Sequence, residues 1–135
     1  MTLRADTLPN LPQLLTLYGR VGWTNYTRRP ERLQAALRGS LVVLTAWEGE
    51  ALIGLARAVG DGVSILFVQD VLVDPALQRQ GVGRALMQAM LERFPEVYQV
   101  QLLADRDSGT EAFYRSLGVR PAEDMGCMAF LRMKG

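Results

Sequence analysis

The stretch FVQDVLVDPALQRQGVGRALMQAM, residues 67–90, decides the fold class. Its first part is almost continuously apolar and ends at Asp74 and Pro75, which is typical of a buried strand. From Gly81 onward, apolar residues recur at offsets of 3, 4, 7 and 8, which predicts an amphipathic helix. The loop QRQGVG between them puts two glycines at a helix start, where unpaired backbone N–H groups can bind an anion such as phosphate.

Two common glycine motifs do not fit this loop. A phosphate-binding P-loop needs Lys and then Ser or Thr after its last glycine, but Gly83 is followed by Arg84 and Ala85. A dinucleotide-binding fingerprint needs a third glycine where Leu86 stands. The remaining readings are an anion-binding loop of another type and a tight turn that only opens a helix.

Working outward, strands and helices alternate along the chain. Period-two and apolar patterns predict strands at residues 2–5, 41–47, 51–59, 64–73, 97–104 and 127–131. Caps and helical spacing predict helices over residues 10–22, 30–39, 81–95 and 108–117. Gly19 and Gly22 are the predicted stop signal of the first helix, and Ser108 with Glu111 forms a capping box at the start of the last. This order predicts an α/β fold with helices packed on a mixed sheet.

Composition indicates one folded domain over residues 1–135. Hydrophobic residues make up 49% of the chain, and 15 basic against 14 acidic residues give a net charge of +1, so a broad nucleic-acid-binding surface has no electrostatic support. No apolar run is long enough to span a membrane and the start does not read as a secretory signal, so we expect a cytoplasmic protein without a membrane partner. Cys127 is the only cysteine, which excludes an intrachain disulfide.

The chain has no histidine. This excludes Ser-His-Asp and Cys-His catalysis, histidine-ligated zinc and histidine acid–base chemistry. We expect no metal cofactor.

Two motifs together resemble the GNAT N-acetyltransferase superfamily. The pattern of Gln or Arg, two residues, Gly, one residue, and Gly or Ala occurs as QRQGVG, residues 78–83, and a helix with FY occurs downstream as EAFYRSLGV, residues 111–119. The resemblance implies a mixed, mostly antiparallel sheet with helices on both faces. It also implies a cleft for acetyl-CoA between two splayed parallel strands.

The resemblance also implies which residues bind acetyl-CoA. The backbone of Val71, Leu72 and Val73 would pair with the pantetheine arm, and an N–H near Leu72 would polarise the thioester carbonyl. The pyrophosphate would lie on the glycine loop and its flanking arginines: Gln78, Arg79, Gln80, Gly81, Val82, Gly83 and Arg84.

Tyr114 is the candidate general acid, because the FY tyrosine of similar proteins points at the CoA sulfur. The alternative is that Tyr114 is only an aromatic residue of the core. However, Tyr114 lies about 100° around the helix from Phe113, which leaves it able to face a cleft. Many members have Asn seven residues before this tyrosine, and this chain has Asp107. A carboxylate cannot donate the amide's hydrogen bond, which puts that pantetheine contact in question.

The base that deprotonates the acceptor amine is not assigned by the sequence. Asp70 breaks an apolar strand, and it is either the base or a carboxylate bonded at the strand end; Glu31, Glu48 and Tyr26 are weaker candidates.

The loop GWTNYTRR, residues 22–29, carries Trp23 and Tyr26, which could bind the acceptor or simply pack on the domain. Cys127 is expected to be a buried small residue of the last strand.

The sequence thus predicts an acetyl-CoA-dependent N-acetyltransferase that acetylates a primary amine, of a small molecule in the leading hypothesis, by direct attack in a ternary complex. The alternatives are a protein N-terminal or lysine acetyltransferase and a non-catalytic acyl-CoA-binding module. Similar proteins are often dimers, so a homodimer is possible, although no sequence patch requires one.

Overall fold

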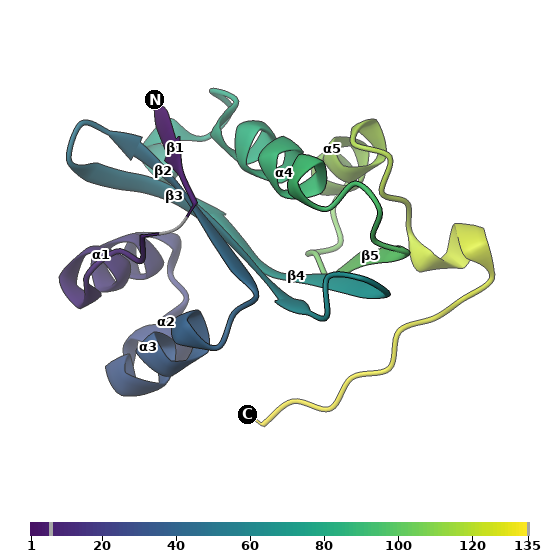
Figure 1. The fold of residues 1–135 in the computed structure, drawn as a ribbon, viewed down its shortest axis with the longest axis horizontal. Helices are drawn as coiled ribbons and strands as arrows, with labels where there is room; N and C mark the ends of the chain where they lie inside the picture. The colour runs from purple at the N-terminus through teal and green to yellow at the C-terminus, as the bar shows by residue number, and fades with distance from the viewer. Residues whose placement is uncertain (6, 135) are drawn as a thin grey trace. The chain divides into compact units, whose positions relative to one another are not determined.

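The structure, a computed structural model, describes residues 1–5 and 7–134. It divides into two compact units, Met1–Leu103 and Ala104–Gly135, which are described one at a time. The elements of the first unit are β1 Thr2–Arg4, α1 Leu11–Val21, α2 Thr24–Thr27, α3 Pro30–Arg38, β2 Val42–Glu48, β3 Ala51–Gly60, β4 Ile65–Val73, the short 3₁₀ helix η1 Pro75–Leu77, α4 Val82–Arg93 and β5 Gln99–Leu102 (Figure 1).

The first unit is a five-stranded sheet covered by helices on both faces. The strands lie in the order β1-β2-β3-β4-β5, and all neighbours are antiparallel except β4 and β5. Helices α1 and α3 lie on one face and α4 on the other (Figure 1). On the α4 face, β3 carries Gly54, where a Cβ would come within 2.9 Å of Val82, so the missing side chain lets α4 pack closely. The predicted mixed, mostly antiparallel fold is confirmed.

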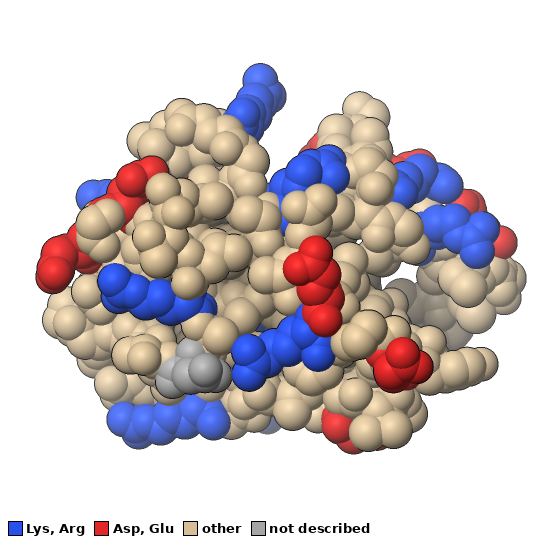
Figure 2. Space-filling model, turned by 45° about the horizontal axis from the view of Figure 1, so that its top comes forward, with Lys and Arg blue, Asp and Glu red and all other residues tan. Residues whose placement is uncertain are grey.

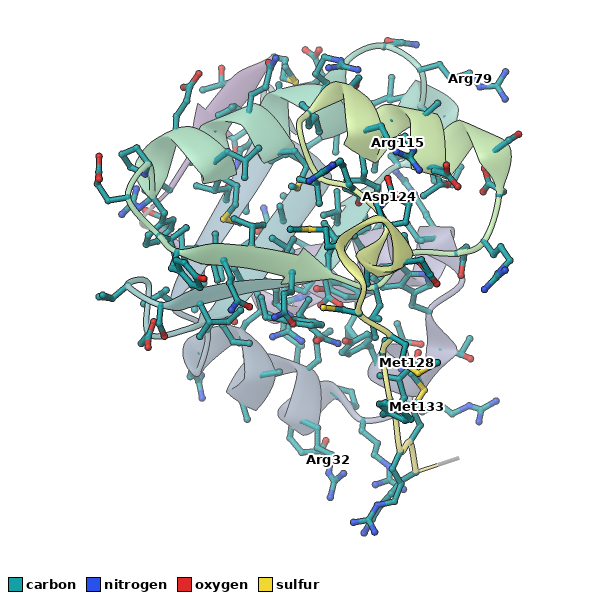
Figure 3. All side chains as sticks on the ribbon, turned by 90° about the vertical axis from the view of Figure 1, so that its right-hand side faces the viewer. Arg32, Arg79, Arg115, Asp124, Met128 and Met133 are labelled. Atoms are coloured by element: carbon teal, nitrogen blue, oxygen red, sulfur yellow. The ribbon has the colours of Figure 1, made fainter. Side chains whose placement is uncertain are left out.

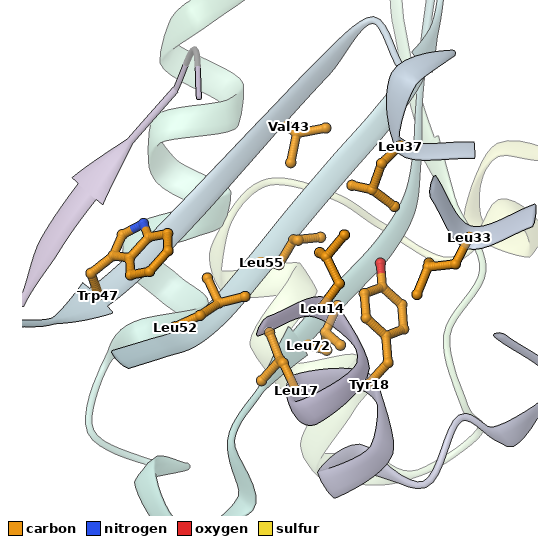
Figure 4. Close-up of a cluster of buried hydrophobic side chains, with 10 residues drawn as sticks. All are labelled: Leu14, Leu17, Tyr18, Leu33, Leu37, Val43, Trp47, Leu52, Leu55 and Leu72. Carbon is orange, nitrogen blue, oxygen red and sulfur yellow. The ribbon is translucent and has the colours of Figure 1, made fainter. Parts of the chain in front are cut away.

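A hydrophobic cluster fills the space between the sheet and helices α1 and α3 (Figure 4). Helical spacing on α1 and strand alternation on the sheet direct apolar side chains into this layer. Its buried members are Leu14, Leu17, Tyr18, Leu33, Leu37, Val43, Trp47, Leu52, Leu55 and Leu72. This layer fixes α1 and the segment after it against β3 and β4.

Strands β4 and β5 are paired over only part of β4. The parallel register joins Ile65–Val68 to Gln99–Leu102. At the same point the β3–β4 register slips, since Arg57 pairs with Asp70 and Ala58 pairs with Val68, so β4 carries an extra residue, Gln69, in a β-bulge. Beyond the bulge, β4 continues to Val73 with no partner on its β5 side among the described residues, as expected for splayed strands.

The second unit contains α5 Ser108–Ser116 and the 3₁₀ helix η2 Ala122–Met125. Asp107 caps α5, since its carboxylate accepts the Thr110 N–H at 2.8 Å. Arg115 on α5 forms an ion pair with Asp124 on η2 at 2.7 Å, and both side chains are labelled in Figure 3. After Gly126, residues 127–134 form neither helix nor strand.

Several sequence predictions were wrong in detail. Gly19 lies inside α1 and only Gly22, at φ 85°, ends it. The GWTNYTRR loop contains one short helix, α2, because a single turn can form without strong local propensity when it packs on other elements. The strand predicted over residues 97–104 is shortened to β5.

Other errors lie in the second unit. Asp107, rather than Ser108, is the N-cap of α5; both residue types cap well, and the Asp carboxylate reaches both the N–H and the hydroxyl of Thr110. The strand predicted at residues 127–131 is absent, and Cys127 is exposed rather than buried. A strand needs a neighbour, which the sequence pattern does not supply.

Candidate active site

The open stretch of β4 presents backbone groups on its free side. Asp74 donates its N–H to the Ile53 carbonyl on β3 at 2.8 Å. In an antiparallel pair the backbone groups of successive residues point alternately toward and away from the partner. Leu72 therefore faces β3, and Val71 and Val73 direct their N–H and C=O groups to the free side. These two residues are the ones that could pair with an extended ligand chain.

The loop after β4 is held in one conformation by local bonds. Asp74 caps η1 by accepting the Ala76 N–H at 3.0 Å, and it accepts a second bond from Arg20 of α1 at 2.5 Å. The Ala76 N–H, followed by Arg20, holds the pKa of the Asp74 carboxyl below its usual range despite burial, which acts in the opposite direction. The end of β4 is thus tied both to its own turn and to α1.

Two residues of the loop adopt left-handed backbone conformations. Gly81, at φ 85°, is the N-cap of α4, and Arg79 has φ 65°, the only described residue other than glycine with positive φ. A non-glycine residue in this region is uncommon and is found often at ligand-binding turns. A Cβ added at Gly81 would meet nothing within 4 Å, so the preference for glycine there comes from the left-handed backbone angle alone.

The first amides of α4 are presented beside these residues. Ala85 makes the first helical bond, to the Gly81 carbonyl at 3.0 Å, so the N–H groups of Val82 and Gly83 precede it. Residues 78–81 are exposed and Arg84 is half-buried; the Arg79 side chain is labelled in Figure 3. Amides at a helix start together with an exposed guanidinium are a suitable site for a pyrophosphate.

On the α1 side of the sheet, Asp70 forms a closed polar cluster with residues from three other elements. Its Oδ2 accepts from Arg57 Nε at 2.5 Å and from the Tyr18 hydroxyl at 2.9 Å. Its Oδ1 accepts from the Tyr26 hydroxyl at 2.9 Å. Arg57 also donates to Ser40 Oγ at 3.3 Å. Asp70 is 2% exposed, so this carboxylate is sealed from solvent.

The electrostatics of the cluster favour the ion-paired form. Burial, with the nearby Asp70 charge, raises the pKa of Tyr18 far above its ordinary value, so this phenol stays protonated and donates. Burial alone would lower the pKa of Arg57, but the charge and hydrogen bond of Asp70 outweigh it and raise that pKa. A carboxylate that already accepts three hydrogen bonds is poorly placed to take a proton from a substrate amine.

The aromatic residues predicted for the acceptor site pack together. Tyr18 contacts Trp23 and Tyr26 edge-on, with ring centroids 6.0 and 5.1 Å apart. Trp23 and Tyr26 are half-buried, and each keeps part of its surface open. Their arrangement fits both packing on the domain and a wall of an acceptor pocket, so their predicted substrate role stays a prediction.

Tyr114 lies on α5 in the second unit, with its ring edge-on to Phe113 at 5.0 Å. Burial raises the pKa of Tyr114 above its ordinary value, which keeps the phenol protonated near neutral pH. Asp107, by contrast, uses its carboxylate to cap the same helix, and the Thr110 bonds hold its pKa low. The general-acid role of Tyr114 stays a prediction.

Sequence reasoning missed Tyr18 and Arg57 as partners of Asp70. A signal was available, because Arg57 is the single charge in the apolar run ALIGLARAV and Asp70 is the single charge in ILFVQDVLV. Two lone opposite charges in neighbouring buried strands are expected to pair. Tyr18 carried no such signal, since its spacing on α1 only placed it in the core.

The sequence model of the Acetyltransferase (GNAT) family matches residues 8–119, which include β4, the glycine loop and α5. The chain belongs to the GNAT acetyltransferase family. A GNAT-family protein from Streptococcus pneumoniae TIGR4 is 41% identical and superposes with a TM-score of 0.88, over 98% of this chain and 97% of that one. Members of the GNAT family use acetyl-CoA, which accords with the open β4 edge and the loop that follows it.

Curated GNAT relatives have different acceptors in their names. The histone acetyltransferase TAP1 of Glycine max is 36% identical over 119 residues, which cover 78% of this chain and 49% of that protein. The chloroplastic serotonin N-acetyltransferase 2 of Oryza sativa is 35% identical over 97% of this chain and 67% of that protein. The chain spans between 43% and 62% of the length of the first curated relatives it matches.

The described residues hold neither a metal-binding cluster nor a membrane-spanning helix. No group of three His, Cys, Asp or Glu side chains is close enough to hold a metal ion. None of the described helices is both long and apolar enough to cross a membrane.

Proposed function

We propose that this GNAT protein transfers the acetyl group of acetyl-CoA to a primary amine of a small molecule, by direct attack in a ternary complex. The amine nitrogen forms a bond to the acetyl carbon, the carbon–sulfur bond breaks, and CoA leaves as the thiol after gaining a proton. The open side of β4 beside the glycine loop carries this proposal, because it combines unpaired backbone groups with an anion-binding helix start.

The residues of the first unit bind the co-substrate in this scheme. Val71 and Val73 pair with the pantetheine arm, and one of their two N–H groups, rather than that of Leu72, donates to the thioester oxygen. A preorganised donor of this kind contributes about 3 kcal/mol to catalysis. Residues 78–84 and the first α4 amides bind the pyrophosphate, with Arg79 and Arg84 supplying positive charge.

Tyr114 donates the proton to the departing sulfur. A thiol has an ordinary pKa of about 8.5, so the leaving group needs only modest help. Because the amine must first lose a proton and no histidine is present, water or a carboxylate accepts it. Asp70 is not our candidate for this base, since Arg57, Tyr18 and Tyr26 already occupy its oxygens.

A small amine is favoured over a polycationic protein by charge and by the aromatic residues. Basic and acidic side chains are interspersed on the face shown in Figure 2, and the net charge is +1, so neither that face nor the net charge favours a histone-like tail. Half-buried Trp23 and Tyr26 offer ring faces to the apolar body of an amine. The similarity to a serotonin N-acetyltransferase agrees with an aromatic amine.

The proposal is tested in two stages. Calorimetric titration with acetyl-CoA and, separately, with CoA is expected to show saturable micromolar binding, and absence of both would reject the co-substrate site. CoA release is then measured with a thiol reagent against arylalkylamines, polyamines, an alanine-initiated peptide and a lysine peptide. Turnover with the first two groups supports the proposal, whereas turnover with peptides alone would establish a protein acceptor instead.

The non-catalytic alternative makes a different prediction. An acyl-CoA-binding module would bind acetyl-CoA in the first stage and release no CoA above the spontaneous rate with any amine.

A further inference from the structure

The guanidinium of Arg57 is the centre of the polar cluster around Asp70. Its Nε donates to Asp70 Oδ2 on β4 at 2.5 Å, its Nη1 to Ser40 Oγ after α3 at 3.3 Å, and its Nη2 to the Tyr26 hydroxyl on α2 at 3.4 Å. Among the described residues, no buried side-chain nitrogen or oxygen lacks a hydrogen-bond partner. The cluster therefore needs no ligand to complete it, as expected of a support rather than of a binding site.

The loop of residues 22–29, here called the aromatic loop, depends on Tyr26 for its attachment to the sheet. Its helix α2 has four residues, no buried residue and no side-chain cap, and a helix this short is not stable by itself. The Tyr26 hydroxyl donates to Asp70 Oδ1 at 2.9 Å, across 44 positions of the sequence. The Tyr26 ring also packs edge-on against Tyr18, which is labelled in Figure 4. The Tyr26–Asp70 bond is thus a side-chain anchor of the aromatic loop.

This anchor lies one residue away from the backbone groups that bind the thioester in the proposed function. Asp70 and Val71 are consecutive on β4, so their Cα atoms are about 3.8 Å apart. The Asp70 carboxylate accepts the hydroxyls of Tyr18 and Tyr26 on the α1 side of the sheet, whereas the Val71 backbone faces the free side of the strand. The aromatic loop therefore docks on β4 next to the residue that receives the acetyl group.

The aromatic loop offers ring surface to a ligand. The Tyr26 hydroxyl is used inside the cluster, and the Trp23 ring lies beside the Tyr26 ring, with centroids 6.1 Å apart and 32° between the planes. Both side chains are half-buried, so part of each ring stays accessible. Arg28 and Arg29 end the loop and are exposed, which disfavours a ligand with several positive charges. This surface suits a monoamine with an aromatic body better than a polyamine.

We propose that the buried Arg57–Asp70 pair, acting through the Tyr26 hydroxyl, positions the aromatic loop to bind the ring of an aromatic monoamine. This inference rests on the proposed acetyl transfer, and it adds which residues set the affinity for the amine. Arg57 and Asp70 are positioning residues in this scheme, and neither takes part in proton transfer. Because the cluster is complete before the amine binds, little ordering of the loop is left to the binding step.

The kinetic test compares Tyr26→Phe with Ser40→Ala. Tyr26→Phe keeps the ring and removes only the anchor, whereas Ser40→Ala removes another partner of the same Arg57 guanidinium, one that otherwise bonds to Ala36. With 2-phenylethylamine as acceptor, Tyr26→Phe is expected to raise the KM for the amine about tenfold, the effect of one lost hydrogen bond. Its kcat should stay within about twofold of the wild type, since the lost contact serves binding only. Ser40→Ala should keep the wild-type KM.

Two kinetic outcomes overturn the proposal. One is an unchanged KM for the amine in Tyr26→Phe. The other is an equal rise in Ser40→Ala, which would show that KM follows the general stability of the cluster rather than the anchor.

Spermidine, which has several charges and no ring, tests the substrate class. The wild type is expected to have a kcat/KM for spermidine at least about tenfold lower than for 2-phenylethylamine. Tyr26→Phe should narrow this ratio, because spermidine gains nothing from ordered rings. A wild type that prefers spermidine, or a ratio that Tyr26→Phe leaves unchanged, overturns the assignment of an aromatic monoamine.

Hydrogen exchange of the free protein tests the anchor without any substrate. The Arg28 N–H donates to the Thr24 carbonyl at 3.0 Å, so its protection reports whether α2 is formed. Tyr26→Phe is expected to speed exchange in the aromatic loop about tenfold, and Ser40→Ala should not. A wild type that acetylates no amine rejects the proposed function and the acceptor role together. An active wild type with unchanged exchange in Tyr26→Phe rejects this inference alone.

Discussion

Two neighbouring residues of β4 lie in opposite surroundings. Asp70 points into a cluster where Arg57, Tyr18 and Tyr26 occupy its oxygens, and it is 2% exposed. Val71 directs its backbone to the free side of the strand, where nothing in the described chain pairs with it. The Asp70 carboxylate is thus already occupied by protein donors, whereas Val71 offers unpaired backbone hydrogen-bonding groups.

The largest expected effect comes from breaking the sealed cluster. Asp70→Ala leaves the Arg57 charge buried without a partner and should lower the free energy of unfolding by about 3 to 5 kcal/mol. Denaturant unfolding measures this loss. The matched control, Arg20→Ala, removes a partner that is 58% exposed from the Arg20–Asp74 pair and should cost less than about 1 kcal/mol.

Measuring kcat tests whether Asp70 is needed for catalysis or only for the stability of the fold. The double variant Arg57→Met with Asp70→Leu removes both charges and should be more stable than Asp70→Ala. If Asp70 is structural, the folded fraction of this variant keeps measurable kcat with a CoA-releasing amine. A stable double variant with no turnover would return Asp70 to the list of candidate bases.

Tyr114→Phe tests the proposed acid with a smaller effect. Removing the hydroxyl should lower kcat by about 10- to 100-fold, the modest end of general acid catalysis, since the thiolate is a fair leaving group. The affinity for acetyl-CoA, measured by calorimetry, should be nearly unchanged. Tyr98→Phe changes an 82% exposed tyrosine and should leave kcat as in the wild type. Equal kcat in both variants would reject the general-acid role.

Gly81→Ala tests whether the glycine loop after β4 binds acetyl-CoA, with Gly22→Ala as its control. Both glycines have φ 85°, both end or begin a helix, and neither has an atom within 4 Å of an added Cβ. Each substitution should cost about 1 to 2 kcal/mol of stability from the left-handed backbone. Only Gly81→Ala should weaken acetyl-CoA binding, by about tenfold, or 1.4 kcal/mol. Equal binding by the two variants would show that the loop is only a turn.

The smallest expected effect is a pH dependence of the free energy of unfolding caused by Asp74. This residue bonds both to η1 and to Arg20 of α1. Its pKa is lower in the folded chain than the unfolded value of about 3.9. Its stabilisation is therefore fully present above pH 4 and is lost as the pH falls through the lower, folded pKa. Compared with Asp74→Asn, the wild type should be more stable by about 1 kcal/mol at pH 7, and this difference should shrink at pH 3. A difference that is constant from pH 7 to pH 3 would contradict the assignment.

Local signals predicted the elements that build the binding loop. The apolar run of β4, the Asp74-Pro75 stop and the glycines of QRQGVG gave the strand, loop and helix almost at their observed bounds. These features succeed because a strand stop and a helix start depend on residues within one or two turns. The left-handed angle at Arg79 was not predicted, because an arginine carries no sequence signal for positive φ.

Long-range features were predicted less well. The Tyr18–Asp70 bond joins residues 52 positions apart, and the β-bulge at Gln69 follows from the β3–β4 register rather than from local propensity. The strand predicted at residues 127–131 failed for a related reason, because strand pattern indicates a suitable segment and not a partner. The single domain over residues 1–135, the roles of Trp23, Tyr26 and Tyr114, and the cytoplasmic location stay predictions.

The sequence by itself determined the family, the glycine loop and the absence of histidine chemistry, since residue identity and short spacing carry those properties. The tertiary structure decided that Asp70 is sealed and that the backbone groups of Val71 and Val73, rather than those of Leu72, face the free side of β4. These properties depend on which side of a strand faces its neighbour. Strand alternation fixes that side only after the register between distant segments has formed.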